Sequence, residues 1–95
     1  MNASRHTGGA TPLYVAAQKG HTEVVKLLIV SKADVNASKQ NGATPLYVAA
    51  QNGHTEVVKL LIGNNADMNI RHSDGQKPID AARRNSHLDI VKLLQ

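Results

Sequence analysis

A chain of 95 residues forms one domain at most, and with no Phe, no Trp and only two Tyr its core must be built from Ala, Val, Leu and Ile. The sequence contains no cysteine, which excludes disulfides, thiolate metal sites and cysteine nucleophiles. The formal net charge of +4 permits weak attraction to anionic surfaces. The Lys and Arg residues are scattered along the chain, so this charge by itself is little evidence for an anionic partner.

The N-terminal segment, residues 1–9, has no apolar stretch of the kind found in a signal peptide or a membrane anchor. The longest apolar runs elsewhere are far too short to cross a membrane. We therefore expect a soluble, cytoplasmic protein that does not contact membranes.

One segment occurs twice almost unchanged. The string GATPLYVAAQKGHTEVVKLLI fills residues 9–29, and the same string, with Asn52 in place of Lys19, fills residues 42–62. A more polar third copy begins near Gly75. Self-similarity at a period of 33 residues is typical of a stacked array of structural repeats.

Each of the first two copies predicts a short first helix. In the first copy, Thr11 is suited to be its N-cap, and Pro12 follows at the first helical position, where no N–H is needed. Gly20 ends the helix, and all three residue types recur 33 positions later. Ala16 and Ala17 leave room for a neighbouring helix to approach closely.

A second helix begins near Thr22 and at the equivalent position of the second copy. Positions 24, 25, 27, 28 and 29 are apolar, which leaves the stripe through Glu23, Lys26 and Val30 for water. We expect this helix to be mostly buried, with Glu23 and Lys26 forming a solvated pair.

The segments at 33–42 and 66–75 are rich in Asp, Asn and Gly and predict hairpin-like loops. Asp34 and Asn36 begin a pattern like that of a calcium-binding loop, but Lys39 stands where such a loop needs glycine, and no Glu closes it. Turn stabilisation is the favoured interpretation.

The string TPLYVAAQNGHTEVVKLLI, followed by ADMN, resembles the ankyrin repeat, whose usual form contains TPLHxAA, then GH, VVxLL and GADxNA. The resemblance covers three copies, from about Gly8 to Leu94. It implies an all-α solenoid of stacked helix-turn-helix ankyrin repeats with hairpin-like loops. We expect a single domain over residues 1–95, with repeats at about 8–40, 41–73 and 74–95.

Two departures from the ankyrin pattern affect local structure. Tyr14 and Tyr47 replace the usual His, so the hydrogen bond that the family makes between Thr and His does not carry over. Lys32 and Asn65 replace the Gly that usually follows the second helix in a left-handed conformation. Asn tolerates that conformation, whereas it costs Lys roughly 1 kcal/mol.

The two ends of the array differ in polarity. The third copy carries polar replacements such as Asp80 and Arg83, so we interpret it as a C-terminal cap. The first copy has no such replacements, and its Leu13, Val15 and Val24 belong to an interior type of repeat. We therefore expect it to present apolar surface, as in a piece of a longer array or a protein that self-associates through its first repeat.

Three histidines, His21, His54 and His87, recur at equivalent positions, which neighbouring repeats place roughly 8–10 Å apart. A zinc ion needs its nitrogen ligands at about 2.0–2.1 Å, so these histidines cannot share one. The resemblance implies instead that they hold the turns by hydrogen bonds to backbone. The sequence shows no phosphate-binding loop and no nucleophile that converges with a base, so we predict no catalytic residue, no metal, no cofactor and no small-molecule substrate.

Tyr14 and Tyr47 are the aromatic residues of the chain, and they occupy one recurrent position. Single-stranded nucleic acids bind to exposed aromatic platforms. A recurrent position in a repeat is usually structural, so we favour packing of these rings beneath the hairpins over nucleic-acid binding.

The resemblance implies a non-catalytic protein–protein interaction module that binds a partner of unknown identity across the hairpin tips and the concave inner-helix face. The alternative is a structural spacer, or an engineered consensus-like scaffold without a partner, which the near-identity of the first two copies favours. Carried over position by position, the candidate binding residues are Thr7, Ala10, Gln40, Asn41, Ala43, Ser73, Asp74 and Gln76 at the tips, and Gln18, Lys19, Gln51, Asn52, Arg84 and Asn85 on the helix edge.

Overall fold

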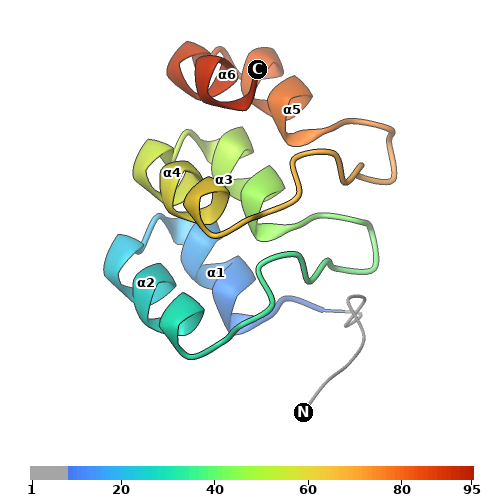
Figure 1. Cartoon of the computed structure of the whole chain (residues 1–95). Helices are drawn as coiled ribbons and strands as arrows, with labels where there is room; N and C mark the ends of the chain where they lie inside the picture. Colours follow the sequence, from blue (N-terminus) through green and yellow to red (C-terminus); the bar gives the residue numbers. More distant parts are fainter. Residues whose placement is uncertain (1–8) are drawn as a thin grey trace.

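The computed structural model describes residues 9–95 and contains three pairs of helices stacked in chain order (Figure 1). This arrangement confirms the predicted all-α solenoid. The inner helices are α1 (Pro12–Lys19), α3 (Pro45–Asn52) and α5 (Pro78–Arg84), and the outer helices are α2 (Thr22–Val30), α4 (Thr55–Gly63) and α6 (Leu88–Leu94).

The inner helices pack directly on one another and carry most of the contact between repeats, while the hairpin-like loops project from the opposite side to the outer helices (Figure 1). Small side chains make this close packing possible. Ala17, Ala49 and Ala50 are completely buried. An alanine core brings helix backbones close together, so the stack is held by many short contacts and not by a few large side chains.

The ends of the inner helices form as the sequence predicts. The Thr11 hydroxyl accepts a hydrogen bond from the Tyr14 amide at 3.1 Å, and Thr44 repeats this contact in α3. At the other end of α1, Gly20 has a φ of 73° in the left-handed region. In the third repeat Lys77 cannot act as an acceptor; instead the carboxylate of Asp80 accepts from the Lys77 amide at 3.0 Å.

Two of the three recurrent histidines, His54 and His87, bind backbone, as expected, but the backbone belongs to the preceding repeat. The Nε2–H of His54 donates to the Gln18 carbonyl at 2.9 Å, and that of His87 donates to the Gln51 carbonyl at 3.1 Å. These carbonyls lie near the C-terminal ends of α1 and α3, where helix carbonyls lack partners within the helix. Each histidine therefore links two repeats.

The Asp-x-Asn segments stabilise turns, which confirms the interpretation favoured over calcium binding. The Asp34 carboxylate accepts from the Asn36 amide at 2.9 Å, and Asp67 makes the same contact with the Asn69 amide. The Asn36 side-chain oxygen also accepts from the Asp67 amide at 2.7 Å. One turn is thus bonded to the next along the stack.

The prediction that α2 is mostly buried is wrong. Val25 is its one buried residue, whereas Val24 is 43% exposed and Leu27 is 66% exposed. In α4 the equivalent of Val24 is Val57, which is 1% exposed because the first repeat covers it. No repeat within residues 9–95 covers the outward side of α2.

The expectation that the first repeat presents apolar surface holds for two of its three residues. Val15 and Val24 are exposed, but Leu13 is buried, because it points into the core between α1 and its neighbours. At the other end of the stack, Arg83 is exposed where the first two repeats have buried alanines. The interpretation of the third repeat as a cap stays a prediction.

Lys32 follows α2 with a φ of 73°, and Asn65 follows α4 with a φ of 70°, as predicted. Replacing Lys32 with Gly removes the cost of holding a side chain in the left-handed region, so we expect the free energy of unfolding to rise by about 0.5–1 kcal/mol. Urea denaturation measures the change. Lys26→Gly, in the middle of α2, is the matched control and should lower stability by about 1 kcal/mol. A stabilisation by both substitutions, or by neither, contradicts the proposed role of the backbone conformation.

The hydrogen bonds between repeats predict unequal effects of the same substitution at two equivalent histidines. His54→Ala should lower the free energy of unfolding by about 1–2 kcal/mol, because the Gln18 carbonyl loses its donor. His21 is exposed, and no repeat precedes it within residues 9–95, so His21→Ala should change stability by less than about 0.5 kcal/mol. Equal losses in thermal or urea denaturation would show that the bond between repeats is not the cause.

Candidate functional site

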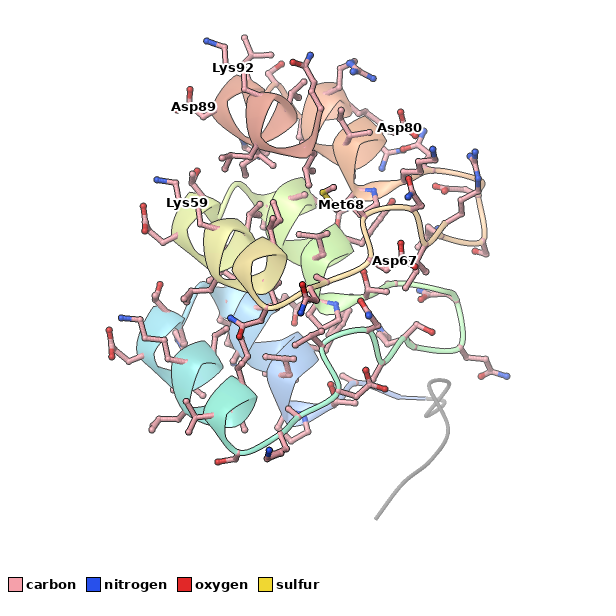
Figure 2. All side chains as sticks on the ribbon, viewed as in Figure 1. Lys59, Asp67, Met68, Asp80, Asp89 and Lys92 are labelled. Atoms are coloured by element: carbon pink, nitrogen blue, oxygen red, sulfur yellow. The ribbon has the colours of Figure 1, made fainter. Side chains whose placement is uncertain are left out.

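The candidate binding surface consists of the hairpins at 39–43 and 71–77 and the exposed edge of α1, α3 and α5; we call it the hairpin surface. It lies away from the outer helices, on the side where Asp67 and Asp80 are labelled in Figure 2. Predicted site residues with exposed side chains are Ala10, Gln18, Lys19, Gln40, Asn41, Asn52, Ser73, Asp74, Arg84 and Asn85, and Gln51 and Gln76 are half-buried.

Two predicted site residues do not contribute to this surface as described. Ala43 is 3% exposed, because it lies beneath the first hairpin and joins the core, so its inclusion among the tip residues was wrong. Thr7 lies outside the described residues.

The two hairpins are closed in the same way and bonded to each other. The Lys39 amide donates to the Ala43 carbonyl at 2.9 Å, and the His72 amide donates to the Gln76 carbonyl at 2.8 Å. Between the hairpins, the Ser73 amide donates to the Asn41 carbonyl at 2.8 Å. The tips therefore form a continuous, backbone-bonded edge and not two independent loops.

Both tyrosines lie buried beneath a hairpin residue, which confirms the packing interpretation. The ammonium nitrogen of Lys39 is 5.0 Å from the centre of the Tyr14 ring, within the range of a cation–π contact. One repeat further along, the His72 ring stacks on Tyr47 with centroids 5.0 Å apart. Burial raises the pKa of the Tyr14 hydroxyl, and the nearby Tyr47 raises it further. These ring faces are covered and are not open platforms for a nucleic-acid base.

Arg84 joins α5 to the second hairpin and to α3. Its Nη2 donates to the Tyr47 hydroxyl at 3.4 Å, and its Nη1 lies 3.9 Å from the Asp74 carboxylate. The same carboxylate lies 3.2 Å from His72 Nδ1. These two contacts restrict the guanidinium, and much of it stays open to solvent.

The pKa of the Asp74 carboxyl lies below its usual value. The largest cause is the hydrogen bond donated by the Gln76 amide at 3.0 Å, and His72 and Arg84 add to the effect. Asp74 is therefore ionised at neutral pH and available to orient Arg84.

A shallow, open depression of about 480 Å³ lies against the end of the second hairpin and is lined by Asp74, Gly75, Gln76, Asp80, Arg83 and Arg84. Three of these residues were predicted as site residues, and the structure brings them together. Asp80 and Arg83 were not predicted; they form an exposed ion pair at 3.5 Å. The spacing of three between an acidic and a basic residue in a helix was a signal that could have identified this pair.

The remaining contacts of the predicted residues are structural. The Asn52 side chain donates to the Gln18 carbonyl at 3.2 Å, and the Asn85 side chain donates to the Ala81 carbonyl at 2.9 Å. Within residues 9–95 no three His, Asp or Glu side chains gather closely enough to hold a metal ion. In the same part of the chain, no helix has the length and apolar character needed to cross a membrane.

Comparison with known proteins gives two findings. The family model described as ankyrin repeats matches residues 13–95 as three copies. A segment of 37 residues is 57% identical to protein phosphatase 1 regulatory subunit 12A of Gallus gallus. That match covers 38% of this chain and 4% of the length of the chicken protein.

The lowered pKa of Asp74 predicts an acid-dependent contribution to stability. Its ionised form favours the folded state above the unfolded pKa near 3.8, and this contribution is lost as the pH falls through the lower pKa of the folded state. Between pH 5 and strongly acidic conditions, the wild type should therefore lose more stability than an Asp74→Asn variant, as measured by urea denaturation at each pH. Asp89→Asn, on the exposed outer side of α6, is the control and should follow the wild type.

Proposed function

The chain belongs to the ankyrin-repeat family, and from this premise we propose that it is a non-catalytic, cytoplasmic module that binds a partner protein through the tips of its hairpins and the concave edge of its inner helices. Protein binding is the general role of such repeats. The chicken relative is named as a regulatory subunit of a phosphatase, which supports a binding role more than a catalytic one.

The observation that carries this proposal is the arrangement around Arg84. Arginine is enriched among residues that contribute most to protein interfaces, because its planar group makes several directional hydrogen bonds while burying apolar surface. Here contacts with Asp74 and the Tyr47 hydroxyl restrict the guanidinium in the free protein. A side chain that is already ordered loses less conformational entropy on binding.

Site-specific photo-crosslinking in cells tests the proposal. A photoreactive amino acid at Gln40, on an exposed hairpin tip, should crosslink a defined partner protein, and one at Lys59, on the exposed side of α4, should not. Adding Arg84→Ala to the Gln40 probe should reduce the crosslinked product about tenfold, the loss expected for an interface anchor.

Equal crosslinking from both faces would contradict the assignment of the surface. No product from either face would favour the alternative of a spacer, which the near-identity of residues 9–29 and 42–62 supports. Circular dichroism of each variant shows whether the fold is retained.

Self-association through the first repeat is a second proposal, with another copy of this chain as the partner. It is supported by the exposure of Val24 and Leu27, whose equivalents Val57 and Leu60 are shielded by a neighbouring repeat. Sedimentation should show a species that dissociates on dilution and is lost in a Val24→Lys, Leu27→Lys double variant. A wild type that is monomeric at every concentration would contradict it.

A further inference from the structure

The outer helices carry balanced charge. α2, α4 and α6 contain three acidic and three basic side chains, one of each per helix. Glu23 pairs with Lys26 at 3.3 Å and Glu56 pairs with Lys59 at 3.4 Å, and all four are exposed. Lys59, Asp89 and Lys92 are labelled on this side of the molecule in Figure 2. The outer side therefore has no excess of either sign.

Within the hairpins and inner helices that define it, the hairpin surface holds more basic than acidic side chains. Its two hairpins and three inner helices hold two acidic side chains, Asp74 and Asp80, against six basic ones. Asp34 precedes the first hairpin, and Asp67 lies on the same side of the molecule in Figure 2, so these two carboxylates offset part of the excess. The basic residues are Lys19, Lys39, Arg71, Lys77, Arg83 and Arg84.

The two carboxylates of this surface are already occupied within the protein. Asp80 accepts from the Lys77 amide and pairs with Arg83 at 3.5 Å. Asp74 accepts from the Gln76 amide and lies 3.9 Å from Arg84. These contacts lie at the two arginines and involve none of the other four basic side chains.

The contacts of Lys39 and Arg71 do not neutralise their charge. Lys39 lies over the Tyr14 ring, and Arg71 donates to the Gly75 carbonyl at 2.7 Å. Both acceptors are uncharged. The surface therefore keeps its positive potential and attracts anionic groups, which at physiological ionic strength act over a Debye length of about 8 Å.

From this distribution we infer that the partner segment bound by the hairpin surface is an acidic stretch of polypeptide, an inference that rests on the function proposed above. The carboxylates of that segment pair with the arginines and lysines of the surface. A polypeptide fits better than a nucleic acid, because the Tyr14 and Tyr47 rings are covered by Lys39 and His72 and offer no stacking platform.

Fluorescence anisotropy with the full chain tests the inference. The probe is a fluorescein-labelled peptide of alternating Glu and Gly, and a peptide with Gln in place of Glu is its neutral match. We expect binding of the Glu peptide that weakens as salt is added. An Arg83→Gln, Arg84→Gln double variant should bind about tenfold more weakly, and a Lys59→Gln, Lys92→Gln variant, which loses the same charge from the outer helices, should bind within about twofold of the wild type.

A Lys19→Gln, Lys77→Gln double variant provides a second test if the arginine variant unfolds, and it should also bind the Glu peptide more weakly. Equal binding of the Gln peptide, or equal losses in variants of the two faces, would overturn the inference. Tighter binding of single-stranded polyuridylate would overturn it in favour of a nucleic acid.

The outcome separates this inference from the proposed function. If the Glu peptide does not bind while the photoreactive group at Gln40 still captures a partner protein, the inference of an acidic partner segment is wrong, whereas the proposed binding surface is retained. If the Glu peptide binds and no partner protein is captured, the recognition of acidic peptides is supported and the proposed binding of a partner in cells is contradicted.

Discussion

The fold depends on contact between neighbouring repeats, because one pair of short helices cannot bury its own apolar side chains. Val24 and Val57 lie at equivalent positions of nearly identical segments, yet one is 43% exposed and the other is 1% exposed. The difference is the neighbour that covers Val57. Hydrophobic stabilisation here is set by position in the stack as much as by the sequence of the repeat. The buried alanines and the bond from His54 to the Gln18 carbonyl act at the same junctions.

Much of the fold could be predicted from the sequence, because its determinants lie within a few residues of one another. The cap at Thr11, the helix end at Gly20 and the left-handed residue at Lys32 each depend on local backbone chemistry. The period of 33 residues then predicted that the repeats stack in chain order. The exposure of α2 could not be predicted from a helix pattern, since the pattern of α2 is the pattern of α4.

The candidate site could be predicted as a region but not as a set of contacts. Arg84 reaches the hydroxyl of Tyr47, 37 positions away, and His72 stacks on the same ring. Such contacts depend on how the hairpin lies over the inner helix, which repeat spacing does not encode. Ala43 was placed at a tip by alignment, although the turn directs it into the core. The charge separation could be recognised once each helix had been assigned to a side.

The crowding at Gly20 and Gly53 limits how a duplicated segment can diverge. A β-carbon on Gly20 would lie 2.7 Å from the His54 ring, and a β-carbon on Gly53 would lie equally close to the His87 ring. The next repeat therefore leaves no room for a side chain at a position where the left-handed backbone already disfavours one. Ser86 occupies the equivalent position of the third repeat with a φ of 62°, and no histidine of a following repeat meets it within residues 9–95. A side chain at this position is thus excluded wherever the next repeat places a histidine ring against it.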